Sequence, residues 1–137
     1  MKGDIYAGEW DGVRKMDCKV ELIPTGKGFC GIRGNPYPYE EHRQNAQDAI
    51  LLAHQKMGSE RYDILILDEI NNALHLRLVD LGQVLEIIRH KPSWMHLVLT
   101  GRDAHPQVIE LADTVSEVTE VKHAYRTGIE PQPGIDY

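Results

Sequence analysis

Two adjacent carboxylates, Asp68 and Glu69, are the side chains best suited to chemistry in this sequence, because they directly follow the apolar run from Ile64 to Leu67. A short aliphatic run of this kind is typical of a strand buried on both faces of a parallel sheet. Ligands of open α/β sheets bind just outside the carboxyl ends of such strands. Two acids at that edge can hold a hard cation and polarise a water molecule.

The stretch from Tyr62 to Ile70, Y-D-I-L-I-L-D-E-I, therefore has the pattern of a Walker B strand in an ATP-using protein. On this interpretation Asp68 binds Mg²⁺ directly or through water, and Glu69 has a catalytic or metal-binding role. An ordinary strand end with two solvated acids would have the same sequence, and that alternative stays open at this point.

The sequence offers no convincing phosphate-binding loop to accompany this strand. A P-loop has the pattern G-x-x-x-x-G-K-[ST] between a strand and a helix. In the candidate P-T-G-K-G-F at 24–29, Lys27 is followed by Gly28, and the next predicted helix begins only at Tyr39. We interpret 24–39 as a long irregular loop that carries one aromatic residue, Phe29.

Two further groups are candidates for ligand contacts. Thr100-Gly101-Arg102 closes the next predicted strand, beside the Asp68 edge, where a threonine and an arginine could contact a phosphate. A strand-to-helix turn with a surface arginine is the alternative. Lys122 and His123 begin a C-terminal tail that either frays or closes over a ligand, and the physics of the sequence does not choose between them.

The elements that must position these groups alternate along the chain, which predicts an α/β fold with a mostly parallel sheet. Apolar spacing and the positions of glycine and proline set their bounds. Residues 1–17 should hold a loop and a short helix. The predicted helices are Tyr39–Met57, Val79–His90 and Pro106–Ala112, and the predicted strands are Cys18–Ile23, Tyr62–Asp68, Met95–Leu99 and Thr114–Val121, with an irregular tail from Lys122.

Composition narrows the class of protein. The 137 residues are most simply one domain, and the net charge of -6 argues against a general nucleic-acid binder. The sequence has no apolar run of membrane-spanning length and begins with the polar stretch M-K-G-D. Its two cysteines, Cys18 and Cys30, are isolated. We therefore expect a cytoplasmic protein with free thiols and no membrane partner.

Several motifs, in order, resemble the P-loop type of ATP:corrinoid adenosyltransferase, which acts on cob(I)yrinic acid a,c-diamide and cob(I)alamin. L-D-E-I at 67–70 looks like the Walker B of that family, and V-L-T-G-R at 98–102 looks like its next strand end. I-E-L-A-D-T-V-S-E-V at 109–118 is similar to its helix-to-strand passage, and V-K-H-A at 121–124 with G-I-D-Y at 134–137 is similar to its tail. M-K-G at 1–3 and G-F at 28–29 complete a resemblance over nearly the whole chain.

The resemblance implies a RecA-like P-loop NTPase fold and transfer of the 5′-deoxyadenosyl group of ATP to the Co(I) of a corrinoid, with release of triphosphate. It implies Mg²⁺ or Mn²⁺ and a homodimer. Asp68 and Glu69 would handle metal and nucleotide, Glu69 being the catalytic candidate. Phe29 would face the corrinoid, and the cofactor-binding candidates would be Phe29, Thr100, Arg102, Lys122 and His123.

Two departures from the family pattern shape the expectations. The first strand and the loop G-N-G-K-G-K-T-T of the family are absent, so residues 1–137 should form a single, partial, N-terminally truncated domain with weak affinity for ATP and little activity of its own. Met1 would then be an internal methionine of a longer protein. Gly31 stands where the family often has a tryptophan. The alternatives are a non-catalytic remnant that binds a corrinoid or a partner, and a generic P-loop kinase or ATPase fragment, which the tail motifs disfavour.

Overall fold

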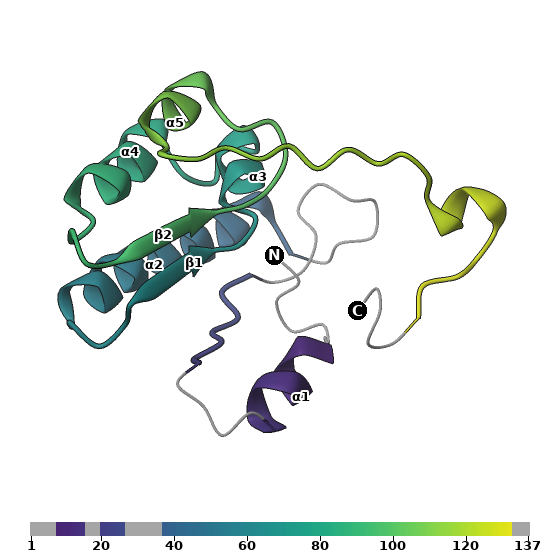
Figure 1. Cartoon of the computed structure of the whole chain (residues 1–137), viewed down its shortest axis with the longest axis horizontal. Helices are drawn as coiled ribbons and strands as arrows, with labels where there is room; N and C mark the ends of the chain where they lie inside the picture. Colours follow the sequence, from purple (N-terminus) through teal and green to yellow (C-terminus); the bar gives the residue numbers. More distant parts are fainter. Residues whose placement is uncertain (1–7, 16–19, 27–36, 133–137) are drawn as a thin grey trace.

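A two-stranded parallel sheet lies at the centre of the computed structural model, which describes residues 8–15, 20–26 and 37–132. Strand β1 (Ile64–Leu67) pairs with β2 (His96–Leu99), so that Ile64 lies opposite His96 and Leu67 lies opposite Leu99. Figure 1 shows the strands side by side with the helices α2, α4 and α5 gathered around them. The parallel pairing of these two predicted strands is confirmed.

The predicted helices form close to their predicted bounds. They are α2 (Tyr39–Gly58), α4 (Leu81–His90) and α5 (Pro106–Leu111). Helix α4 begins after Asp80 because the Asp80 and Gln83 side chains form a reciprocal capping box with the backbone. The short helix expected near the N-terminus is α1 (Gly8–Lys15).

One hydrophobic core joins the elements from α2 to α5. Helix α2 contributes a stripe spaced three and four residues apart, and α4 contributes a facing set, so the two helices bury their apolar sides against each other. The most deeply buried large side chains are Leu78, Val84, Ile87 and Met95. No helix within the described ranges is long and apolar enough to cross a membrane.

The sheet is covered on one face only, in the part of the chain that the structure describes. Leu65, Leu67, Leu97 and Leu99 pack against the core. The alternate side chains Ile64, Ile66 and Val98 remain 55%, 59% and 42% exposed. The prediction that the Tyr62–Asp68 strand is buried on both faces is therefore wrong here, because all of the described core-forming helices pack against the leucine face.

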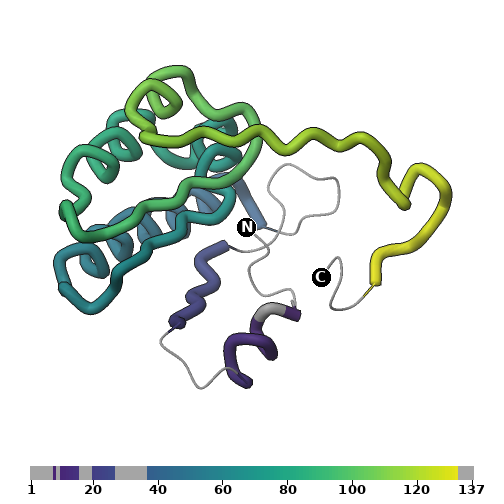
Figure 2. The backbone as a smooth tube through the Cα atoms, in the orientation of Figure 1, coloured from purple at the N-terminus to yellow at the C-terminus, as the bar shows by residue number. Residues whose placement is uncertain are grey.

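Two predicted strands do not form in the described residues. The described part of Cys18–Ile23, from Val20 onward, has no regular structure, and Thr114–Val121 is exposed and forms no helix or strand. Figure 2 shows the second segment leaving the globular part of the chain as a long tube. Both segments have strand-like composition, but neither lies on a sheet edge that could satisfy its backbone.

Two short helices were not predicted. Helix α3 (Ile70–His75) follows Glu69 immediately, and the 3₁₀ helix η1 (Ala124–Thr127) interrupts the tail that was expected to be irregular. Helix α3 escapes sequence patterns because it is only six residues long and contains two asparagines. It matters for function because it begins at the carboxyl end of β1, beside the candidate acids.

Candidate functional site

The hydroxyl of Thr100 joins the carboxyl ends of the two strands. Its Oγ1 donates to Asp68 Oδ1 at 2.7 Å and accepts the main-chain N–H of Glu69 at 2.9 Å. The first residues after β1 and β2 are therefore side by side, as parallel strands require. Of the predicted site residues, Asp68, Glu69 and Thr100 are brought into one cluster.

Glu69 turns the chain from β1 into α3 in an unusual backbone conformation. Its φ of 61° and ψ of 21° lie in the left-handed region, which is uncommon for a residue other than glycine. Such conformations cost about 1–3 kcal/mol and collect at functional sites. The bend breaks the alternation of the strand, which would otherwise aim consecutive side chains at opposite faces.

Gly101 allows the second turn to pack closely against α3. Its φ is 118°, and a Cβ built on it would lie 2.7 Å from Asn72 Oδ1 and 3.1 Å from Asn71 Cβ. The next residue, Arg102, donates its main-chain N–H to Asn72 Oδ1 at 2.6 Å. Asn71 in turn donates its main-chain N–H to the Thr100 carbonyl at 3.1 Å. Hydrogen bonds that link residues 71 and 72 to residues 100 and 102 thus join the start of α3 to the turn after β2.

Asn71 presents an unused acceptor near this cluster. Its side chain is 5% exposed, and its buried Oδ1 has no hydrogen-bond partner among the described residues. Buried polar atoms are nearly always hydrogen-bonded in folded proteins. An unpaired one therefore indicates a position where a water, an ion or a ligand binds. Sequence reasoning missed both Asn71 and Asn72. The available signal was two amides one residue beyond an acidic pair at a strand end.

The donor set suits a hard cation that is shared with a ligand. The carboxylates of Asp68 and Glu69, the Thr100 hydroxyl and the Asn71 carbonyl oxygen are all of the oxygen type that Mg²⁺ and Mn²⁺ prefer. Within residues 8–15, 20–26 and 37–132, no three His, Cys, Asp or Glu side chains gather in a way that could hold a metal alone. A cation here would therefore need oxygens from a bound molecule, as Mg²⁺ commonly takes from phosphates.

Two of the remaining predicted residues, Lys122 and His123, do not join this cluster. Lys122 and His123 directly precede η1, and Figure 1 shows the extended segment between α5 and η1 leading away from the sheet. His123 Nδ1 accepts the main-chain N–H of Tyr125 at 3.1 Å and so caps η1. The structure therefore does not bring these two residues to Asp68. Phe29 lies outside the described residues.

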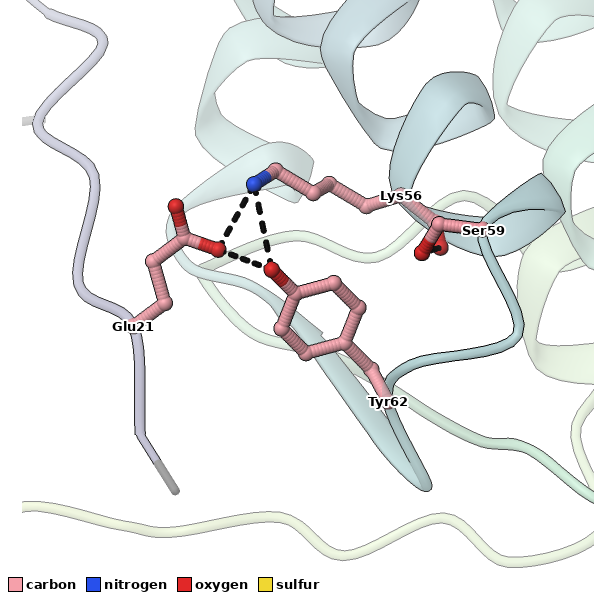
Figure 3. Close-up of polar contacts among 4 residues, drawn as sticks. All are labelled: Glu21, Lys56, Ser59 and Tyr62. Carbon is pink, nitrogen blue, oxygen red and sulfur yellow. Dashed lines mark hydrogen bonds and ion pairs between the residues drawn. The ribbon is translucent and has the colours of Figure 1, made fainter. Parts of the chain in front are cut away.

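A second polar cluster lies at the opposite, amino end of β1 (Figure 3). Lys56, near the end of α2, donates to Glu21 Oε2 at 2.6 Å and to the Tyr62 hydroxyl at 3.1 Å, and that hydroxyl also donates to Glu21. The Lys56 ammonium and the Tyr62 hydroxyl lower the pKa of Glu21, and Glu21 raises the pKa of Lys56. The cluster attaches segment 20–26 to the end of α2 and to the residues just before β1, and it is separate from the candidate site.

Comparison with known proteins decides the family. A family model described as "ATP:corrinoid adenosyltransferase BtuR/CobO/CobP" matches residues 1–137. The chain belongs to this family. Curated relatives include the corrinoid adenosyltransferases of Pseudomonas aeruginosa, 34% identical over all of this chain and 66% of the relative, and of a Sinorhizobium species, 39% identical over all of this chain and 64% of the relative.

A third member of the family, corrinoid adenosyltransferase CobA of Salmonella typhimurium, is 31% identical over 95% of this chain and 66% of its own length. The chain thus spans slightly less than two thirds of the length of these relatives. Both strand ends of the candidate site lie inside the matched region. The observed α/β architecture with a short parallel sheet is compatible with a P-loop adenosyltransferase.

Proposed function

We propose that this chain supplies the cation-binding part of an adenosyltransferase that moves the 5′-deoxyadenosyl group of ATP to the Co(I) of a corrinoid. The observation that carries the proposal is the family match over residues 1–137, together with the Asp68–Thr100 contact at the carboxyl edge of the sheet. The relatives at 31–39% identity are named corrinoid adenosyltransferases. The RecA-like P-loop fold, the homodimer and the cytoplasmic location belong to the same proposal.

The reaction asks little covalent chemistry of the protein. The electron pair of Co(I) attacks C5′ of ATP, the C5′–O5′ bond breaks, and triphosphate leaves with the electrons of that bond. The protein's task is to hold both substrates in line and to stabilise the charge that develops on the leaving oxygen. Mg²⁺ or Mn²⁺ would supply part of that charge stabilisation.

Each candidate residue is assigned one part of this task according to its position. Asp68 binds the cation directly or through water, and Glu69 binds it or acts in catalysis. Thr100 fixes the Asp68 carboxylate by donating to it, and the Arg102 guanidinium pairs with phosphate. Lys122, His123 and Phe29 are proposed substrate contacts, and Lys122 and His123 would have to approach the site when substrates bind.

Binding of Mn²⁺, followed by its electron paramagnetic resonance signal, tests the cation site. Mn²⁺ should bind to the 137-residue chain together with tripolyphosphate. Asp68→Asn should weaken that binding by about tenfold or more, because the variant lacks the charged carboxylate that contacts the cation or its bound water. Asp63→Asn is the matched control, because Asp63 directly precedes the other end of β1. Equal effects of the two variants would contradict the assignment of the cation to Asp68.

Activity is tested on a longer protein that contains the family's P-loop segment joined to this chain. Addition of ATP and Mg²⁺ to Co(I) corrinoid should change the corrinoid absorption spectrum as the cobalt–carbon bond forms. An unchanged spectrum would count against adenosyl transfer. The 137-residue chain should be nearly inactive because its loop P-T-G-K-G-F at 24–29 lacks the P-loop pattern, and ordinary turnover by it would refute the expected need for a phosphate cradle.

A second candidate function is non-catalytic binding of a corrinoid or of a partner protein. The observation that favours it is the sequence of the glycine-rich loop, where Lys27 is followed by Gly28 and not by the serine or threonine of a P-loop. Separate titrations with ATP and with a corrinoid discriminate between the two functions. Binding of corrinoid without binding of nucleotide would favour the second.

A further inference from the structure

Asn72 lies at the contact between α3 and the turn that follows β2. Its Oδ1 accepts the main-chain N–H of Arg102 at 2.6 Å, and the same oxygen occupies the space that a side chain at Gly101 would need. The carbonyl oxygen matches the N–H donor that the turn presents to α3. An apolar side chain of similar size would leave that exposed donor to water and would no longer tie the turn to α3.

The neighbouring hydrogen bonds fix Thr100, so the position of Arg102 depends on its own contact with Asn72. Thr100 is already fixed by Asp68, by the Glu69 N–H and by the Asn71 N–H. Those bonds set the beginning of the turn but leave residue 102 free to rotate about Gly101, whose φ of 118° favours glycine. Among the described residues, Asn72 alone accepts a hydrogen bond from the main-chain N–H of Arg102.

The guanidinium of Arg102 is exposed and forms no ion pair or hydrogen bond within the described part of the chain. It is carried on a turn that is bonded to the turn of Asp68 and Glu69. A cation at Asp68 and a guanidinium at Arg102 would together flank an anionic, multiply charged ligand. A polyphosphate chain has that chemistry, since it takes a metal on one set of oxygens and arginine on another.

We propose that Asn72 is a positioning residue: its Oδ1 holds the Arg102 turn so that the guanidinium meets the phosphate chain whose cation is bound at Asp68. Asn72 itself does not touch the ligand. The nature of the ligand rests on the proposed function, whereas the effect of Asn72 on Arg102 stands on the hydrogen bond alone.

Amide hydrogen exchange, followed by NMR on the 137-residue chain, tests the positioning step without any ligand. Asn72→Ala should accelerate exchange of the Arg102 amide by about tenfold, the effect of one hydrogen bond. The Glu69 amide, which donates to Thr100, is the internal reference and should keep its rate. Asn72→Asp retains an acceptor oxygen and should retain protection of Arg102. Unchanged exchange at Arg102 in Asn72→Ala would overturn the proposal.

Binding of tripolyphosphate in the presence of Mn²⁺ tests the link to the ligand. Asn72→Ala and Arg102→Ala should each weaken binding, with about tenfold lost for Arg102→Ala because a charge-assisted bond disappears. The double variant should bind no more weakly than Arg102→Ala, because Asn72 acts only through the guanidinium. A further loss in the double variant, equal to that caused by Asn72→Ala alone, would overturn the positioning role.

The two measurements distinguish failure of the proposed function from failure of the positioning role. If the unsubstituted chain binds no tripolyphosphate, the proposed function fails in this chain, and amide exchange alone decides whether Asn72 fixes Arg102. If tripolyphosphate binds and Asn72→Ala accelerates exchange while leaving affinity unchanged, the proposed function survives and the positioning role is refuted.

Discussion

Thr100 Oγ1 lies 2.7 Å from Asp68 Oδ1, although the two residues are 32 positions apart in the sequence. The Glu69 main-chain N–H donates a hydrogen bond to the same hydroxyl. Together the two hydrogen bonds join the carboxyl ends of β1 and β2. The hydroxyl acts as a donor to a carboxylate and as an acceptor from the backbone at the same time, so no apolar side chain of the same shape can replace it.

Thr100→Val should therefore destabilise the chain by about 1 kcal/mol or more, because the isosteric valine removes the hydroxyl and with it the hydrogen bonds to Asp68 and to the Glu69 N–H. Thr100→Ser keeps the hydroxyl and should recover most of the loss. Urea denaturation gives the free energies of unfolding. Similar values for the valine and serine variants would show that these bonds contribute little.

Gly101→Ala should cost about 1–3 kcal/mol, since alanine is strained at a φ of 118° and its Cβ would press on Asn72 Oδ1 at 2.7 Å. Gly82→Ala is the matched control. Gly82 lies in helix α4, where an added Cβ would meet no atom within 4 Å, so alanine there should stabilise the helix by about 0.5–1 kcal/mol. Thermal unfolding of both variants measures the opposite signs, and equal shifts of Tm would contradict the strain assigned to position 101.

The Glu21–Lys56–Tyr62 cluster should make attachment of segment 20–26 depend on pH. The Lys56 ammonium and the Tyr62 hydroxyl lower the pKa of Glu21 in the folded chain. A lowered pKa means that the contact is present above the pKa of a free glutamate and is lost as the pH falls through the folded value. The raised pKa of Lys56 has the opposite consequence, so that this contribution is lost as the pH rises through the folded value.

Titration of the Glu21 carboxyl by NMR measures this effect. Lys56→Met removes the charge but keeps the length of the side chain, and it should move the pKa of Glu21 upward toward that of a free glutamate. Lys91→Met is the control, because Lys91 donates to the Met95 carbonyl and not to Glu21. If the Glu21 titration were the same in both variants, the contact with Lys56 would be absent in solution.

The two faces of β1 should respond differently to the same substitution. Ile66 is 59% exposed, so Ile66→Thr should change the free energy of unfolding by no more than about 0.5 kcal/mol. Leu65 packs against the core from the other face, and Leu65→Thr should cost about 2 kcal/mol or more. Urea denaturation compares the two. A large cost at Ile66 would mean that something covers the exposed face in solution.

The sequence allowed prediction of those features that depend on local periodicity. Helix α2, helix α4, and strands β1 and β2 have clear patterns, and the parallel pairing then brings Asp68 and Thr100 together. The failed strand at Thr114–Val121 shows the limit, because valine and threonine favour extended backbone but do not supply a neighbouring edge. Burial of β1 on both faces failed for the same reason, since coverage depends on distant elements.

The roles of Asn71 and Asn72 could not be predicted from the sequence for a different reason. Their contacts follow from two backbone conformations, the left-handed Glu69 and the positive φ of Gly101, which bring α3 against the second turn. Left-handed residues other than glycine have no reliable sequence signal. The acidic pair predicted the location of the candidate site. The backbone conformations of the two turns determine that Asn71 and Asn72 lie beside it.

The extended segment after α5 separates the part of the chain that has a buried core from a part that has none. The buried core ends at Val108, and every described residue from Glu110 onward through Gln132 is exposed. The residues from α2 to α5 therefore form one cooperative unit that contains Asp68 and Thr100, whereas Lys122 and His123 lie beyond it. A melting curve of this chain will therefore report on the unit that contains Asp68 and Thr100 and will not respond to Lys122 or His123.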